Sequence, residues 1–280
     1  MKKAILAVSF GTTYEDTRKL TIDKIEEKIR ETFKEYEVRR AFTAHRIISV
    51  LKQRDGVVVN TPEEALNRLM LEGFEEIIVQ PLHLIPGEEY QYVMKVVENF
   101  KKSFKKISAG RPILFHKGFG NQLPDDYETL VETIKPIIPS KGITVFMGHG
   151  SAHNANACYS CLQLVLQDNG FNNVYIANVE GYPDIKNVIN KIKRSQSLLD
   201  ENKDSVTLIP LMVVSGDHAK NDMAGEGEDS FKNLLLNAGF KVNLHLHGLG
   251  ELKNFQNIYI KHIEDVIENR YEVYGKGNKS

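Results

Sequence analysis

The fold is indicated most clearly by Ile143-Thr-Val-Phe-Met-Gly-His149-Gly-Ser-Ala-His153. Apolar and β-branched residues run directly into Gly-His-Gly, and a polar segment that permits a helix follows. This order is typical of a buried parallel strand that ends in a tight turn. Ligands bind at the carboxyl ends of strands in open α/β sheets, so the turn places His149 where chemistry usually occurs. The flanking glycines let the backbone bend sharply and leave the imidazole uncrowded.

Strands and helices alternate on both sides of this stretch. Strands are expected at residues 3–8, 36–42, 76–82, 113–116, 143–147, 174–179, 206–214 and 242–247. Helices are expected at 14–33, 45–53, 88–104, 156–168, 229–237 and 251–274, with others that begin near 61 and 184. Helix follows strand without hairpin signals, which favours parallel sheets covered by helices on both faces.

The alternation falls into two cycles, which predict two similar lobes. Lys135–Lys141 holds two prolines and is the best linker, so the lobes are expected at residues 1–134 and 142–280. Each lobe is expected to be an α/β unit with a four-stranded parallel sheet. The final helix, 251–274, is expected to pack back on the first lobe.

The two cycles also resemble each other in sequence. Residues 77–89 align with 206–218, so that Pro81 matches Pro210 and Glu89 matches His218. Likewise, residues 4–12 align with 143–151. Duplicated α/β halves usually hold a ligand between them. A cleft between the lobes is therefore expected, with Glu89 facing His218 across a pseudo-two-fold axis.

The composition is that of a soluble globular protein. The chain has 280 residues, is 41% hydrophobic and carries a formal net charge of -1. This balance provides no overall field for nucleic acid or an anionic membrane. The N-terminus begins like a signal peptide, but its apolar run stops at Gly11, no cleavage site follows, and no segment approaches the ~20 apolar residues of a membrane span. A first β-strand and a cytoplasmic protein are expected.

Three strand ends of the second lobe carry side chains that bind metals. These are His149, Glu180 and His218. Two imidazoles and a carboxylate make a suitable site for a borderline divalent metal and leave positions open for water or substrate. The alternative is that each loop simply carries one polar residue, as loops of α/β proteins often do. The sequence contains no HExxH motif, so the spacing of these residues does not decide between the two interpretations.

Other polar residues have less specific patterns. Ser9, Thr12 and Thr13 either bind an anion or cap the following helix. His245 and His247 alternate on one predicted strand and share a face, but the sequence shows no carboxylate partner nearby.

Further motifs are either weak or missing. His153 lies one turn beyond His149 and is expected to cap or orient it. Cys158 and Cys161 form a lone CxxC pair and are interpreted as structural thiols. No GxGxxG, Walker loop or GxSxG is present, which argues against dinucleotide or NTP use and against a serine hydrolase.

The whole chain resembles the class II tetrapyrrole metal chelatases, specifically the anaerobic cobalt chelatases that act on sirohydrochlorin. The matching motifs are Ser-Phe-Gly-Thr at 9–12, Pro-Leu-His-Leu-Ile-Pro-Gly-Glu-Glu-Tyr at 81–90, Gly-His149-Gly-Ser, Val-Glu180-Gly-Tyr-Pro, and Pro-Leu-Met-Val-Val-Ser-Gly-Asp-His218-Ala-Lys-Asn-Asp-Met. The resemblance implies two similar lobes with a cleft between them, and Co²⁺ held as the substrate metal by His149, Glu180 and His218.

Roles and partners are expected from the resemblance together with the positions of the residues, Glu89 from its place as the counterpart of His218. His149 and Glu89 are the expected catalytic residues, and Ser9, Phe10, Thr12 and Glu89 are the expected substrate contacts. The expected partners are sirohydrochlorin or precorrin-2 and a divalent metal, without an organic cofactor, in a chain that forms a homo-oligomer. Co²⁺, Fe²⁺ and Ni²⁺ all suit these ligands. A metal-dependent hydrolase and a non-catalytic tetrapyrrole or metal carrier remain alternatives.

Overall fold

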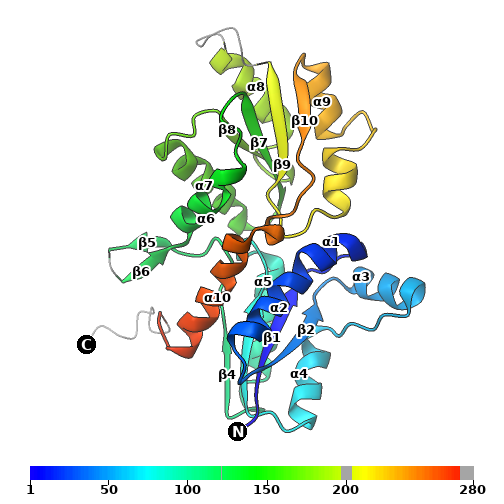
Figure 1. Ribbon diagram of the computed structural model, residues 1–280, viewed down its shortest axis with the longest axis vertical. Coiled ribbons are helices and arrows are strands. Elements are labelled where there is room, and N and C mark those ends of the chain that lie inside the picture. The colour runs from blue at the N-terminus through cyan, green and yellow to red at the C-terminus, as the bar shows by residue number, and fades with distance from the viewer. Residues whose placement is uncertain (121, 197–203, 272–280) are drawn as a thin grey trace.

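The computed structural model describes residues 1–120, 122–196 and 204–271, and it contains two four-stranded parallel sheets (Figure 1). The first sheet has the order β2-β1-β3-β4 and the second β10-β9-β7-β8. The strands are β1 (Lys3–Ser9), β2 (Glu37–Phe42), β3 (Glu76–Pro81), β4 (Lys106–Ala109), β7 (Ile143–Gly150), β8 (Val174–Glu180), β9 (Ser205–Pro210) and β10 (Lys241–Leu244). The helices are α1 (Glu15–Leu20), α2 (Ile22–Thr32), α3 (His45–Val50), α4 (Pro62–Leu71), α5 (Glu88–Asn99), α6 (Asp126–Ile134), α7 (Ala157–Asp168), α8 (Ile185–Gln196), α9 (Phe231–Asn237) and α10 (Lys253–Ile267). The expected architecture of two parallel α/β sheets is confirmed.

The two sheets repeat one topology. When β7 to β10 are matched in order with β1 to β4, both sheets have the same strand order. The register also repeats, because Val8 lies opposite Pro81 and Met147 lies opposite Pro210. The next residue makes the same bond in each lobe: Leu82 N–H donates to the Val8 carbonyl at 2.6 Å, and Leu211 N–H to the Met147 carbonyl at 2.7 Å. The internal alignment thus reflects a structural repeat.

The fourth strand of the first sheet is not where the apolar pattern predicts it. The strand is β4, at residues 106–109, whereas the expected strand 113–116 is a connecting segment. Ile113 and Leu114 are fully buried, and their N–H groups donate to the carbonyls of His83 and Leu84. Their apolar character therefore reflects burial at the junction of the lobes. The true strand is a short, half-exposed edge strand with a weaker apolar signal.

Several element boundaries also differ from expectation. The expected helix 14–33 is broken at Thr21 into α1 and α2, and 88–104 stops at Asn99. The strand expected at 206–214 stops at Pro210, since proline cannot donate to a sheet ladder. An antiparallel hairpin, β5 (Lys117–Phe119) and β6 (Leu123–Asp125), was not expected. The expected end of the last helix at 272–274 lies outside the described residues.

Hydrogen bonds at the first turn of helix α4 explain why it begins where the sequence predicts a helix start. Thr61 caps α4, since its hydroxyl accepts from Glu64 N–H at 3.2 Å and the Glu64 carboxylate accepts from Thr61 N–H at 2.9 Å. Pro62 occupies the first helical position, where its missing N–H costs nothing. The helix buries Leu66 and Leu69 against the sheet.

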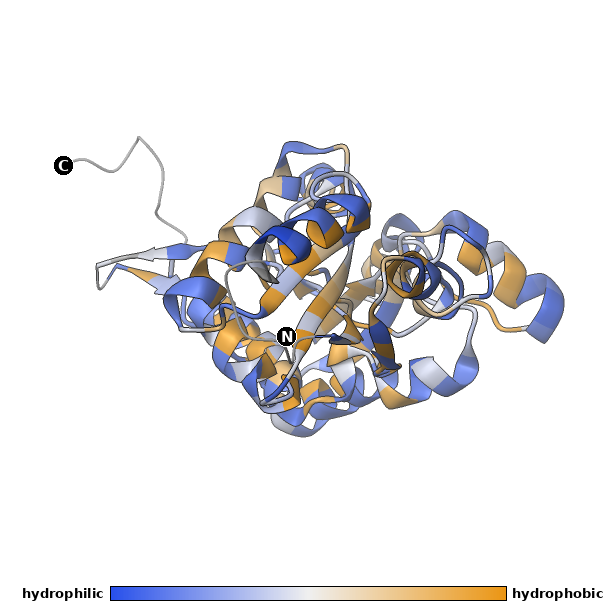
Figure 2. Cartoon of the chain, turned by 90° about the horizontal axis from the view of Figure 1, so that it is seen from above, coloured by the Kyte–Doolittle hydropathy of each residue, from blue (hydrophilic) through white to orange (hydrophobic). Residues whose placement is uncertain are grey.

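Helices cover both faces of each sheet. In the first lobe α4 and α5 pack on one face, while α2 and α10 pack on the other. In the second lobe α8 and α9 cover one face and α7 the other. Hydrophobic residues, drawn orange, accordingly lie on the strands and on the inward sides of helices in Figure 2.

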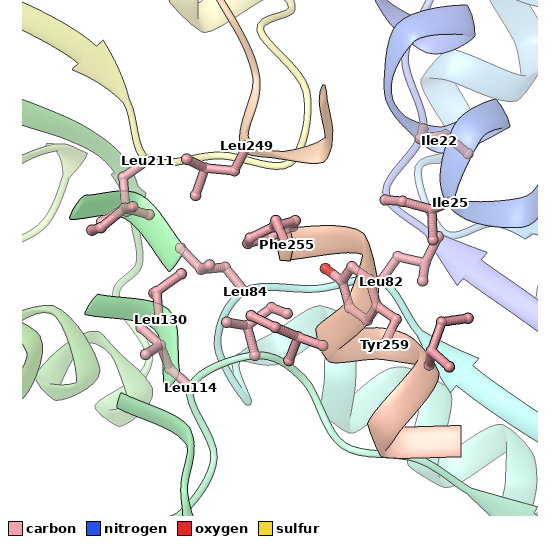
Figure 3. Close-up of a cluster of buried hydrophobic side chains, with 14 of the residues drawn as sticks. Ile22, Ile25, Leu82, Leu84, Leu114, Leu130, Leu211, Leu249, Phe255 and Tyr259 are labelled. Carbon is pink, nitrogen blue, oxygen red and sulfur yellow. The ribbon is translucent and has the colours of Figure 1, made fainter. Parts of the chain in front are cut away.

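One hydrophobic cluster continues from lobe to lobe (Figure 3). Its labelled members are Ile22, Ile25, Leu82, Leu84, Leu114, Leu130, Leu211, Leu249, Phe255 and Tyr259. In this cluster α10 contacts helix α2 and strand β3 of the first lobe, and α6 contacts both α10 and α7. The shared core therefore crosses the predicted linker 135–141, and the domain boundary itself stays a prediction.

A buried charged network ties α6 and α10 together. Arg111 lies 3.0 Å from Asp126 of α6 and 2.7 Å from Asp265 of α10. His262 places Nδ1 3.0 Å from the Arg111 carbonyl. Burial alone would raise the pKa of Asp126, but His262 and Arg111 outweigh it and lower that pKa.

Candidate active site

His149 stands at the carboxyl end of β7. Its ring Nδ1 lies 3.0 Å from the carbonyl oxygen of Gly150, which can only accept a hydrogen bond. Gly150 has φ 79°, and a Cβ atom there would stand 1.5 Å from the Glu180 carbonyl oxygen. Only glycine therefore lets β7 and β8 approach so closely at this point. The flanking glycine thus sets the position of His149 and the spacing to β8.

His218 reaches the same region from the loop after β9. It precedes a short π-helical turn, Ala219–Met223, and its Nδ1 lies 2.7 Å from a carboxylate oxygen of Asp222. The strands β7 and β9 are neighbours at the point where the strand order of the sheet reverses. Ligand sites of open α/β sheets lie at such switch points. The topology therefore brings the two histidines together.

The two imidazoles form a close pair. The ring centroids of His149 and His218 are 4.6 Å apart, and the ring planes meet at 88°. Each Nδ1 faces an oxygen that only accepts, so each Nδ1 carries the hydrogen and the neutral ring keeps its lone pair on Nε2. Two such nitrogens are suitable ligands for a borderline divalent metal.

Glu180 lies next to this pair along the sheet. It is opposite Gly150 in the β7–β8 register and is exposed, and its carboxylate makes no hydrogen bond or ion pair with the described residues. The following turn is fixed by Asn156 and Asn178, whose side-chain amides donate to the Tyr182 carbonyl. Within residues 1–120, 122–196 and 204–271, no group of three His, Cys, Asp or Glu side chains is close enough to hold a metal ion. The triad with Glu180 stays a prediction.

Glu89 occupies the pseudo-equivalent place in the first lobe. It lies in the first turn of α5 and is half-buried. Burial, a hydrogen bond to Glu63 and the nearby charge of Glu89 together raise the pKa of Tyr92. The carboxylate of Glu89 makes no hydrogen bond or ion pair with any residue that the structure describes. Its role, and its position facing His218, remain predictions.

The other expected substrate contacts differ in exposure. Phe10 is 46% exposed, while Ser9 and Thr12 are 4% and 5% exposed. Thr12 Oγ1 accepts from the N–H of Tyr14 at 3.2 Å, which is a turn-stabilising contact at the start of α1. Of these residues, Phe10 has the most surface available for a flat ligand.

A contact between the lobes lies beside His218 and has no sequence signal. The hydroxyl of Tyr14 donates to Asp217 at 3.0 Å, and this bond is the largest cause that raises the pKa of Tyr14. The ammonium of Lys220 lies 3.8 Å from the centre of the Tyr14 ring. The loop that carries His218 is therefore attached to the first lobe.

Other residues singled out from the sequence have structural positions. His153 caps the short turn Asn154–Asn156, since its Nδ1 accepts from Ala155 N–H at 3.1 Å. Cys158 and Cys161 are free thiols.

His83, which lies in the 81–90 motif, is unusual in the structure. Both of its ring nitrogens are buried without a hydrogen-bond partner among the described residues, and burial lowers its pKa to about 4. The ring is therefore neutral at neutral pH.

The fold and the histidine pair define a two-lobed α/β protein of the chelatase type. Two solved structures share this fold: SirB from Bacillus subtilis with Fe³⁺ (TM-score 0.62, 17% identity, 96% of this chain and 97% of that one) and CbiX, described as the terminal enzyme for biosynthesis of siroheme in denitrifying bacteria (TM-score 0.54, 16% identity, 94% and 98%).

Sequence comparison then identifies the family. A family profile described as "Cobalt chelatase (CbiK)" matches residues 3–268, and the chain belongs to this family. A Salmonella typhimurium protein named sirohydrochlorin cobaltochelatase is 36% identical over 95% of this chain and 97% of its own. Another from Nitratidesulfovibrio vulgaris, named sirohydrochlorin cobaltochelatase CbiKC, is 28% identical over 95% and 91%. None of the described helices is long and apolar enough to cross a membrane.

Proposed function

We propose that this chain inserts Co²⁺ into sirohydrochlorin, a step of cobalamin synthesis. The observation that carries the proposal is the pair of imidazoles, His149 and His218, whose Nε2 lone pairs are left free by hydrogen bonds at Nδ1. Membership of the cobalt chelatase family supports the reaction, and the names of the two relatives support the substrate.

In this proposal, Co²⁺ binds first to the two histidines. Glu180 supplies a carboxylate as the third ligand, since it is exposed and unpaired among the described residues and lies on the neighbouring strand. Water completes the coordination and is displaced as the pyrrole nitrogens approach. Three protein ligands leave positions open, so the metal can be transferred rather than kept.

Two pyrrole N–H protons must leave as the metal enters, because ligands bind a metal in the deprotonated form. A histidine whose Nε2 is released as Co²⁺ leaves it, such as His149, or a nearby carboxylate can accept these protons. Glu89 is a suitable acceptor, since its carboxylate is unpaired among the described residues and is the counterpart of His218 in the other lobe. Its predicted role is that of a general base or an orienting group.

The macrocycle is expected between the lobes, with Phe10 against its flat face. Phe10 is exposed at the end of β1, and in the internal alignment it is the counterpart of His149. Aromatic rings favour offset stacking with other flat π-systems. The contacts of Ser9 and Thr12 with substrate stay predictions, as do a cytoplasmic location and a homo-oligomer.

The experiment is an anaerobic insertion assay followed by absorbance. Wild-type protein should convert sirohydrochlorin to its cobalt complex, whereas His149→Ala and His218→Ala should not. His45→Ala changes an exposed histidine and is the matched control. A spectral shift of sirohydrochlorin without insertion would indicate a binding protein, and no interaction with sirohydrochlorin would favour a metal-dependent hydrolase. Parallel reactions with Fe²⁺, Ni²⁺ and precorrin-2 define the specificity.

A further inference from the structure

A second pair of imidazoles lies at the start of the connection from β10 to α10. The ring centroids of His245 and His247 are 4.9 Å apart and the ring planes meet at 52°. The residues follow β10, which ends at Leu244, and alternation along an extended backbone places both rings on one side. His247 is well exposed, with 61% of its side chain accessible. The pair is therefore accessible from solvent.

A carboxylate that the sequence pattern does not reveal completes this cluster. Glu251 Oε2 lies 2.8 Å from Nδ1 of His247, and its other oxygen accepts from Gly248 N–H at 3.0 Å. The short turn Leu249–Glu251 folds the chain back and brings the carboxylate to the histidine. Because the carboxylate accepts at Nδ1, the neutral His247 ring has its lone pair on Nε2.

The arrangement repeats that of the proposed substrate-metal site. In both places two imidazole centroids lie less than 5 Å apart, at 4.6 Å and 4.9 Å. In both, one histidine bonds through Nδ1 to a carboxylate four residues later, His218 to Asp222 at 2.7 Å and His247 to Glu251 at 2.8 Å. A carboxylate on the second ring nitrogen is the usual companion of a metal-binding histidine.

The surroundings suit a bound ion. The two histidines and Glu251 line a depression of about 260 Å³ whose apolar side is formed by Ile137, Leu249 and Leu252. This space accommodates a hydrated ion. The connection is also anchored, since Leu249 and Gly250 donate to the carbonyls of Met212 and Val213 in the loop that leads to His218.

We propose that His245 and His247 bind a second divalent cation of the borderline class, such as Co²⁺, Ni²⁺ or Zn²⁺, with Glu251 orienting His247. The two Nε2 atoms are the protein ligands and water fills the other positions, because no third His, Cys, Asp or Glu of the described residues joins them in a metal-binding group. Imidazole is a suitable ligand for these three metals. The site is separate from His149 and His218 and does not depend on the proposed reaction.

The test uses a variant in which both histidines of the proposed substrate-metal site, His149 and His218, are replaced. Anaerobic calorimetry with Co²⁺ on the full chain carrying His149→Ala and His218→Ala should still detect one bound equivalent. Adding His245→Ala and His247→Ala should abolish it, whereas adding His45→Ala, an isolated exposed histidine, should not. The proposal is overturned if the first variant binds no Co²⁺, or if His45→Ala removes as much binding as the His245 and His247 changes. Circular dichroism of each variant excludes unfolding as the cause.

A second variant tests the role of Glu251. Glu251→Gln keeps an oxygen for the Gly248 N–H but removes the charge that faces His247. Loss of such a partner typically lowers metal affinity 10–100-fold, and a decrease on that order is expected for the second site. Unchanged affinity would overturn the orienting role. Insertion of Co²⁺ into sirohydrochlorin is measured in separate assays of protein that retains His149 and His218. Failure of the proposed reaction and failure of the second metal site are therefore distinguishable.

Discussion

Nδ1 of His218 lies 2.7 Å from Oδ2 of Asp222, and this bond holds the imidazole with its Nε2 atom free. The two residues are four positions apart, across one short π-helical turn that begins just after His218. The carboxylate thereby selects the tautomer that binds metal through Nε2 and fixes the orientation of the ring. Metal affinity at the active site should therefore depend on a residue that does not touch the metal.

Asp222→Ala is expected to weaken Co²⁺ binding by about 10–100-fold while the chain remains folded. Asp222→Asn should have a smaller effect, since an amide oxygen still accepts from Nδ1 but carries no charge. Asp217→Ala is the matched control, because Asp217 accepts from Tyr14 and Asn221 instead of from His218. Calorimetry and the ¹⁵N shifts of the His218 ring are the measurements. Equal losses of affinity for Asp217 and Asp222 variants would show that the bond to His218 has no special role.

Glu180→Gln and Glu89→Gln should separate metal binding from proton removal. Glu180→Gln should weaken Co²⁺ binding directly, since an amide oxygen is a poorer ligand than a carboxylate. Glu89→Gln should leave Co²⁺ affinity nearly intact but lower the insertion rate by on the order of 10²-fold, the usual contribution of a general base. Single-turnover insertion under anaerobic conditions measures the rates. Insertion at the wild-type rate by Glu89→Gln would exclude a chemical role for that residue.

His83 should make the protein less stable as the pH falls. The pKa of His83 is about 4 in the folded chain, because burial opposes the charged form of the ring. The ordinary histidine value of 6.5 applies in the unfolded chain. Above pH 6.5 the ring is neutral whether the chain is folded or unfolded. Between pH 6.5 and 4 the unfolded chain binds a proton that the folded chain does not, so stability decreases by on the order of 3 kcal/mol across this window.

His83→Leu removes this proton uptake and the two unpartnered ring nitrogens. Urea unfolding at several pH values should show a smaller decrease in the free energy of unfolding for this variant than for the wild type. His45→Ala, at an exposed position, should retain the wild-type decrease. An identical pH dependence in His83→Leu and wild type would contradict a lowered pKa at this residue.

Arg111→Ala should destabilise the junction of the lobes. The side chain is 11% exposed and pairs with Asp126 and Asp265, which are 3% and 9% exposed. Removing one partner of a buried ion pair leaves an uncompensated charge and typically costs about 3–5 kcal/mol. Arg39→Ala is the control, since its ion pairs are solvent-exposed and should contribute about 1 kcal/mol at most. Denaturant unfolding measures both, and equal effects would show that the buried network adds nothing.

The sequence by itself predicted the architecture, because that information is local and periodic. Apolar strand runs, the Thr61 cap and the alternation of strand with helix define two parallel α/β sheets. The repeat of Pro81 and Pro210 predicted their equivalence, and the β-sheet register confirms it. The sheet edge to which His149 and the loop of His218 belong could be located, because the carboxyl edge of a parallel sheet follows from strand order alone.

Only the tertiary structure decided which side chains meet. Ile113 and Leu114 are apolar enough for a strand, yet they are buried by the other lobe, and β4 is elsewhere. Asp222 and Glu251 reach their histidines through the geometry of short turns, which no periodic pattern encodes. The contact of Tyr14 with Asp217 joins residues 203 positions apart. Periodicity reports which face of an element is buried, whereas partners in a site depend on distances that are set once both lobes have packed on one core.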